Sequence, residues 1–156
     1  MPNLLVATVI RSLHNIFTSI WVGGMLAMVL SFLPVIRKEV QDAGTQGNVI
    51  DQVLIRQSRW VYLGIIVLFG SGVLMTRLSG QSSGLFDFSN SYATILSIKH
   101  LLVIVMTLIA IVRSTVFRKA ATSKNKAKKK VSMALLMINT LIGVAILVLS
   151  SINAIL

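Results

Sequence analysis

Four long apolar stretches, separated by shorter polar segments, dominate the sequence. They cover approximately residues 4–36, 60–76, 91–117 and 131–154. A mostly apolar run of about 20 residues is long enough to cross a bilayer as a helix. The pattern predicts an all-α protein with a single transmembrane domain over residues 1–156, folded as an integral membrane up-and-down four-helix bundle.

The basic residues between these stretches predict the orientation of the bundle. Of the fifteen Lys and Arg residues, twelve lie within or beside the segments 37–59 and 118–130. Because cytoplasmic loops of membrane proteins are enriched in Lys and Arg, both segments are expected to be cytoplasmic loops. The N and C termini and the loop 77–90 are then on the outer side. This is the arrangement of a multi-pass protein in the cytoplasmic membrane of a prokaryotic cell. The remaining basic residues are Arg11, Arg77 and Lys99.

Composition supports a membrane protein and excludes several kinds of site. Hydrophobic residues make up 55% of the chain and there is no cysteine. The mean hydropathy is +0.86. Disulfides, thiolate zinc sites and iron–sulfur clusters are therefore excluded. The net charge of +11 is concentrated in short loops. We therefore expect the lipid bilayer, and no nucleic acid, as a partner.

Polar residues on the first span point to a site inside the bundle. One stripe at helical spacing, with Gly24 beside it, comprises Arg11, His14, Thr18, Trp21, Met25 and Met28. An ionisable residue within a membrane span is costly, so it normally faces the bundle interior and has a partner there. His14 is consequently the central candidate of the site.

The second histidine, His100, lies in the third span at a similar expected depth. His14 is 23 residues from Arg37, and His100 is 18 residues from Arg118. At a rise of about 1.5 Å per residue, both histidines lie in the outer half of the bilayer. The first and third spans are diagonal in an up-and-down bundle, with axes roughly 13 Å apart.

This separation suits two imidazoles with one iron between them. The sequence thus predicts haem b, with His14 and His100 as axial ligands. Arg11, Arg77 and Lys99 are the candidate partners of the haem propionates. Small residues of the second span, together with the region of Trp21 and Gly24, would leave room for the ring.

Other interpretations of the same residues stay open. Imidazole also suits copper, and methionines of the spans offer soft sulfur ligands. Buried histidines can also simply form hydrogen bonds between helices. Lys99 is adjacent to His100 and about 100° away around the helix, so either residue could face the centre.

Two short motifs resemble a known family. His14 is followed on the first span by Trp21-Val22-Gly23-Gly24, and the third span contains Ser97-Ile98-Lys99-His100-Leu101-Leu102. These motifs resemble those of the copper resistance protein D-like membrane family and are similar to those of the related bacterial membrane protoporphyrinogen oxidases. The resemblance implies a redox protein associated with haem b or copper. It also implies Lys99, as an alternative to His100, at the second ligand position.

From these observations we expect a b-type haem protein that transfers electrons in the membrane. A quinol, partner subunits of a redox complex or a second copy of the chain are its candidate partners. The alternatives are an oxidoreductase enzyme similar to the protoporphyrinogen oxidases, a membrane protein that binds or transports copper, and a structural subunit without redox chemistry. No catalytic acid–base pair or nucleophile is visible in the spans.

Overall fold

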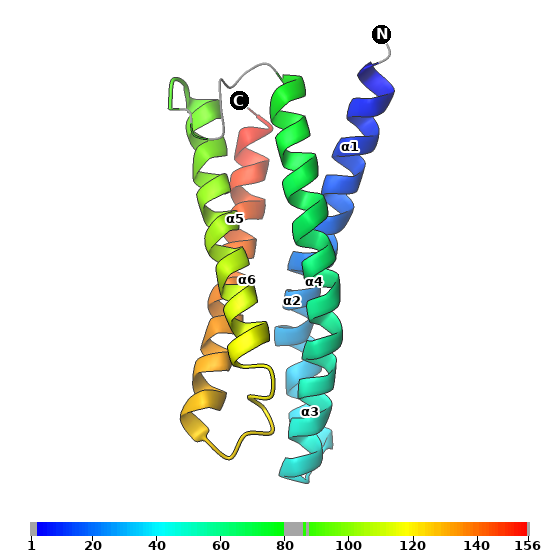
Figure 1. Ribbon diagram of the computed structural model, residues 1–156, viewed down its shortest axis with the longest axis vertical. Helices are drawn as coiled ribbons and strands as arrows, with labels where there is room; N and C mark the ends of the chain where they lie inside the picture. The colour runs from blue at the N-terminus through cyan, green and yellow to red at the C-terminus, as the bar shows by residue number, and fades with distance from the viewer. Residues whose placement is uncertain (1–2, 80–85, 87, 156) are drawn as a thin grey trace.

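The chain forms an antiparallel bundle of four long helices, as the sequence predicts. The computed structural model describes residues 3–79, 86 and 88–155, which contain helices and no strand. The four helices that are long and apolar enough to cross a membrane are Leu4–Glu39, Ala43–Leu78, Ser91–Val116 and Lys126–Asn153. Both ends of the chain lie at the same end of the bundle (Figure 1). The fold class is confirmed, whereas the outward direction of the termini stays a prediction.

The first span is a continuous helix interrupted by two wider, π-helical turns. It comprises α1 (Asn3–Thr18), the turn η1 (Ser19–Gly23), α2 (Gly24–Ala27), the turn η2 (Met28–Phe32) and α3 (Leu33–Glu39). The helix does not end at Pro34, although a proline lacks the amide hydrogen that a helix interior requires. Pro34 directly follows η2, and the wider turn accommodates the hydrogen bond that the proline cannot form.

The second helix, α4 (Ala43–Ser79), is much longer than the predicted span. The sequence predicts a span over 60–76 preceded by a cytoplasmic loop over 37–59. In the structure only residues 40–42 separate α3 from α4. Asp42 begins the helix by accepting a hydrogen bond from the Thr45 backbone amide at 2.6 Å. Hydrogen bonds from Thr45 lower the pKa of the Asp42 carboxyl.

A buried carboxylate explains why the beginning of α4 is ordered. Asp51 is 5% exposed. It accepts hydrogen bonds from the Ala121 and Thr122 amides, both at 3.0 Å, and from the Thr122 hydroxyl at 2.6 Å. A β-carbon on Gly47 would lie 2.7 Å from the Ala121 oxygen, so only glycine permits this approach. These hydrogen bonds and this close approach hold the segment that follows α5 against α4.

The third and fourth helices begin at asparagine caps. The Asn90 side chain accepts from the Ala93 amide at the start of α5 (Ser91–Val116). The Asn125 side chain caps α6 (Lys126–Asn153) in the same way. The predicted boundaries were 91–117 and 131–154, so α6 begins within the predicted 118–130 loop. Residues 80–85 and 87 of the predicted 77–90 loop lie outside the described residues.

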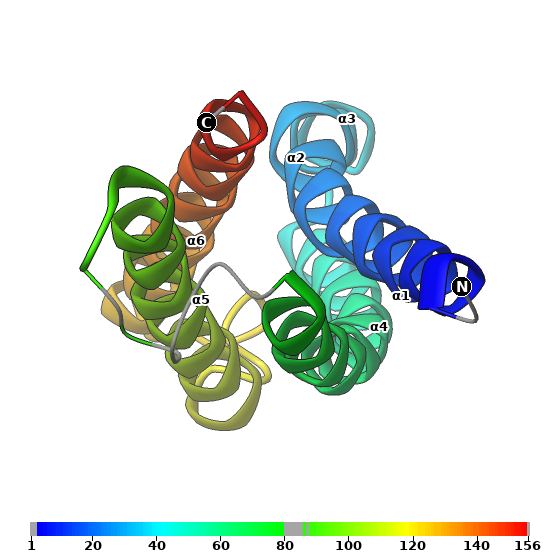
Figure 2. The ribbon, with the colours of Figure 1, turned by 90° about the horizontal axis from the view of Figure 1, so that it is seen from above.

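The bundle consists of two helical hairpins. The first span packs against α4, and α5 packs against α6. Figure 2 shows these two pairs side by side when the bundle is seen from above. Between the hairpins, α4 contacts α5, while η1 and α2 contact α6. The buried core at this junction includes Trp21, Met25, Met28, Met106 and Leu136. Outward-facing residues such as Ile66 and Leu141 are exposed apolar side chains suited to lipid.

Candidate functional site

His14 is held on the inner face of α1 by one hydrogen bond from across the hairpin. Its Nδ1 atom lies 2.8 Å from the Ser71 Oγ atom of α4. The Ser71 hydroxyl donates to the Val67 carbonyl oxygen at 2.6 Å. Since the serine hydrogen is already used, the serine oxygen accepts from Nδ1–H. In this tautomer the hydrogen is on Nδ1 and Nε2 carries none. The lone pair of Nε2 can therefore bind a metal.

Small residues on α4 make room for this histidine. A β-carbon on Gly72 would lie 3.9 Å from the His14 Cε1 atom. One on Gly64 would lie 3.9 Å from the Phe17 ring. Gly64 and Gly72 thus face α1, and side chains of this same chain fill the space beside them. No flat cofactor is needed to explain them.

The second candidate pair lies on the diagonal helix. Lys99 and His100 are both half-buried in α5. They lie on the helix diagonal to the span that contains His14, since α5 packs against α6 and contacts α4. Within residues 3–79, 86 and 88–155, there is no group of three or more His, Cys, Asp or Glu residues that could enclose a metal.

The two outer arginines are placed differently from the histidines. The side chains of Arg11 and Arg77 are exposed. Long basic side chains near the end of a span commonly extend toward the polar interface. Their positions fit boundary residues of the membrane.

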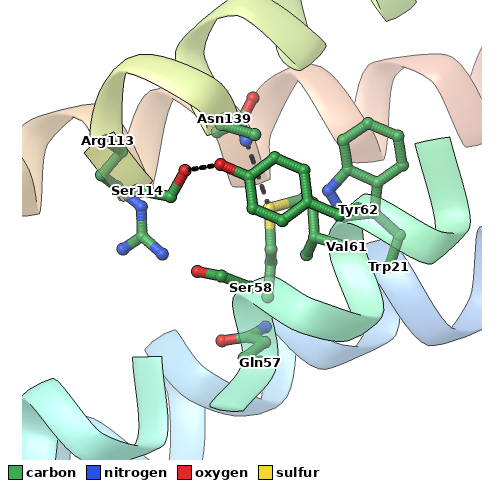
Figure 3. A pocket seen from close by; sticks show the side chains of 10 residues that line it. Trp21, Gln57, Ser58, Val61, Tyr62, Arg113, Ser114 and Asn139 are labelled. Atoms are coloured by element: carbon green, nitrogen blue, oxygen red, sulfur yellow. Dashed lines mark hydrogen bonds between the residues drawn. The ribbon is translucent and has the colours of Figure 1, made fainter. Parts of the chain in front are cut away.

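Trp21 and Gly24 belong to a separate site about two helical turns from His14. A β-carbon on Gly24 would lie 3.2 Å from the Gln57 Nε2 atom. Together with this glutamine and Trp21, side chains of all four long helices surround a small pocket (Figure 3). Its enclosed volume is ≈ 20 Å³. That is room for about one water molecule. The pocket is lined by Trp21, Met25, Gln57, Ser58, Val61, Tyr62, Ala110, Arg113, Ser114 and Asn139.

Polar groups of this pocket are only partly satisfied by one another. The Asn139 amide nitrogen donates to the Met25 sulfur at 3.5 Å, and the hydroxyls of Tyr62 and Ser114 form a hydrogen bond between α4 and α5. Both contacts are drawn in Figure 3. The buried groups with no hydrogen-bond partner include Trp21 Nε1, Asn139 Oδ1 and both amide atoms of Gln57.

Sequence reasoning missed most of this pocket for identifiable reasons. Gln57 lies in the segment 37–59, for which the sequence predicts a loop, and Arg113 lies close to the basic segment 118–130, where a boundary charge is common. The polar face of the fourth span is the one available signal, since Asn139, Gly143, Ser150 and Asn153 share it at helical spacing. Ser150 is half-buried, and the other three are buried.

Comparison with known protein families matches residues 51–152 to the family described as Copper resistance protein D. The match covers α4 from Asp51 onward, α5 and nearly all of α6, including Lys99 and His100. His14 precedes it. No curated protein and no solved structure matches the chain. The resemblance to the protoporphyrinogen oxidases rests on the short motifs alone.

The family match corrects the expected function. The interpretation as a b-type haem protein for electron transfer is wrong, because the family is one of copper resistance. Paired imidazoles suit iron and copper alike, so the histidine pattern could not distinguish the two metals. Without a haem, there are no propionates to assign to Arg11, Arg77 and Lys99. There is likewise no reason to expect a quinol or redox subunits. The copper alternative agrees with the match, and the chain belongs to the copper resistance protein D family of membrane proteins.

Proposed function

We propose that this protein binds copper within the membrane and moves it, with the metal ion as cargo. The family match over residues 51–152 carries this proposal. The donor set agrees with it, because imidazole and thioether groups are the uncharged ligands that copper accepts. The spans contain two histidines and several buried methionines, and the chain has no cysteine.

We infer that His14 is the first ligand and that His100 is the second. The hydrogen bond between His14 Nδ1 and Ser71 supports the first assignment, because it directs Nε2 toward a metal and fixes the ring. The half-buried position of His100 in α5, the helix diagonal to that of His14, supports the second. Lys99 is the alternative second ligand, on the resemblance of its motif. Two protein ligands suit an ion that is passed on, whereas storage usually uses a more complete cage.

We also propose the cytoplasmic membrane of a prokaryotic cell as the location, with the basic loops on the cytoplasmic side. In that orientation, the histidine site lies toward the outer surface. Copper would then enter the bundle from outside. The asymmetric distribution of Lys and Arg supports this direction.

The test measures copper in whole cells and on purified protein. Cells that express the wild type should contain an altered amount of copper relative to cells with an empty vector, and the purified protein should bind Cu(I). His14→Ala should abolish both effects, and His100→Ala should reduce them more than Lys99→Ala. Asn15→Ala is the matched control, because Asn15 is the exposed neighbour of His14 on the same helix.

Two results would contradict the proposal. One is wild-type protein that neither binds copper nor changes the copper content of the cell. The other is a His14→Ala variant that behaves like Asn15→Ala in both measurements. If Lys99→Ala abolishes binding while His100→Ala does not, copper binding stands and the second ligand is Lys99.

A further inference from the structure

Arg113 is a cation inside the bundle for which the described residues provide no counter-ion. Its side chain is half-buried at the basic end of α5. In Figure 3, the guanidinium points into the space beside Ser58 and Gln57. The described acidic residues are Glu39, Asp42 and Asp51. Both oxygens of the buried Asp51 are already hydrogen-bonded to Ala121 and Thr122.

Two adjoining pockets meet at this arginine. The first is the pocket between the four helices, and the second lies nearer the basic segment after α5. Both are lined by Ser58, Arg113 and Ser114. Including their open mouths, the two pockets measure ≈ 330 and ≈ 260 Å³. The second pocket adds Arg118 and Ser132 to the lining, together with apolar side chains of Leu54, Ile55 and Phe117.

The inner wall of the first pocket contains hydrogen-bonding groups that lack a partner. Trp21 is 2% exposed and Asn139 is 3% exposed, yet the indole Nε1 and the amide Oδ1 bond to no described atom. The nitrogen and oxygen of the Gln57 amide also have no hydrogen-bond partner among the described residues. Buried polar groups are normally satisfied by protein, water or a ligand. The pocket is therefore equipped to bind a polar group that the protein does not itself supply.

The chemistry of the lining identifies the class of ligand. A guanidinium offers a fork of N–H donors that matches the oxygens of a phosphate. The second basic group, Arg118, is exposed. Apolar residues beside these groups suit the glycerol and upper acyl part of a lipid. Basic pockets between membrane helices are known to bind anionic headgroups.

We propose that Arg113 binds the phosphate of an anionic phospholipid from the leaflet at the basic end of the bundle. The headgroup lies at the mouth between α4 and α5, with Arg118 at its outer side. Gln57 and Trp21 donate to it from the inner wall, directly or through one water molecule in the enclosed part. The site joins the two hairpins where α4 meets α5. This inference is independent of the copper proposal, because it concerns a different end of the bundle.

The test is native mass spectrometry of the full chain, released from membranes that contain equal amounts of phosphatidylglycerol and phosphatidylcholine. The wild type should retain one phosphatidylglycerol in preference to phosphatidylcholine. Arg113→Gln should lower this preference by roughly tenfold or more, as expected for the loss of a charge-assisted contact. Arg56→Gln should leave it unchanged, because Arg56 is an exposed arginine of α4 outside both pockets.

Three further measurements decide the source of the phosphate and protect against misfolding. Arg113→Lys should retain part of the preference, since it keeps the charge and loses only the fork. Its unfolding temperature should match that of the wild type. Addition of inorganic phosphate should not displace the lipid. Displacement would assign the site to a free anion and overturn the lipid proposal. Equal lipid retention by wild type and Arg113→Gln would also overturn it.

Discussion

One hydrogen bond at His14 determines which imidazole nitrogen is directed at a ligand. Ser71 accepts from Nδ1 because its own hydrogen is used by the Val67 carbonyl, and Nε2 is thereby left as the acceptor. In metal sites, groups of this kind orient the ligand and tune its basicity. The serine is therefore a positioning residue for the proposed copper ligand.

Replacing this serine should weaken copper binding without removing a ligand. Ser71→Ala leaves the imidazole free to change tautomer and to rotate, and we expect the Cu(I) affinity to fall by about 10- to 100-fold. Competition against a chelator of known affinity measures this. Ser71→Thr is the control, because a threonine hydroxyl can make the same two hydrogen bonds. Unchanged affinity in Ser71→Ala would show that the hydrogen bond only stabilises the hairpin.

For His14, the sequence predicts the face of the helix on which it lies but not its partner. Helical spacing places His14 on the inward stripe, and the structure shows it half-buried. Its partner Ser71 is 57 positions away on another helix, and no spacing rule predicts such a contact. The same limit applies to the choice of metal, since a pair of histidines is compatible with either copper or haem.

At the scale of elements, the close approach of η1 and α6 depends on one glycine. A β-carbon on Gly143 would lie 3.2 Å from both methyl carbons of Val22 and 3.4 Å from the Met25 Cε atom. Valine has little rotational freedom, so it cannot easily make way for a larger side chain. This contact is one of those that join the two hairpins.

A large side chain at this position should therefore loosen the bundle. We expect Gly143→Leu to destabilise the fold by about 1–3 kcal/mol through overpacking. Thermal unfolding in detergent provides the measurement. Gly70→Leu is a matched control, since a β-carbon on Gly70 meets nothing within 4 Å. Similar unfolding temperatures for the two variants would mean that α6 shifts without cost.

The first residues of α4 are helical although their composition predicts a loop. Residues 43–59 contain Gly44, Gly47 and several polar side chains, a composition typical of loops. Tertiary contacts override this local preference, because Asp51 and Gly47 bind the segment that follows α5. The asparagine cap at Asn90, by contrast, is a local signal, because its side chain accepts from the Ala93 amide three residues further along the chain.

Removing the charge of the buried carboxylate should release that segment. In Asp51→Asn, an amide NH₂ would oppose one of the donors from Ala121 or Thr122. We expect a loss of about 1–3 kcal/mol in unfolding free energy. Asp42→Asn is the control, because Asp42 is exposed. The second readout is proteolysis within 118–125, which should be faster in Asp51→Asn than in Asp42→Asn. Equal rates in both variants would contradict the proposal that Asp51 holds this segment against α4.

At the scale of the whole molecule, the apolar pattern predicts the four helices, their antiparallel order and the diagonal placement of the first and third spans. These properties follow from the length of each apolar run and the short connections between them. The pocket around Trp21 and Asn139 does not follow from such a pattern. Its walls come from all four helices, and their relative rotation is determined by packing.

The predicted orientation can be tested with single cysteines, because the chain has none of its own. Gln41 lies between α3 and α4, and Phe88 precedes α5, and both are exposed. In intact cells, Phe88→Cys should react with a membrane-impermeant thiol reagent. Gln41→Cys should react only after the cells are opened. The reverse labelling pattern would place the histidine site on the cytoplasmic side and invert the direction of copper entry.

The two π-helical turns of the first span allow its two ends to be aimed separately. A turn of this kind holds one more residue than an α-helical turn. The turn η1 lies between His14, which faces α4, and Met25, which faces α6. Because η1 takes up one surplus residue, deleting one residue there, such as the exposed Ser19, would restore regular winding and leave His14 and Met25 on their present faces. The same deletion in a regular α-helix would rotate one end by about 100° relative to the other. The direction of His14 relative to Met25 therefore depends on the wider turn that lies between them.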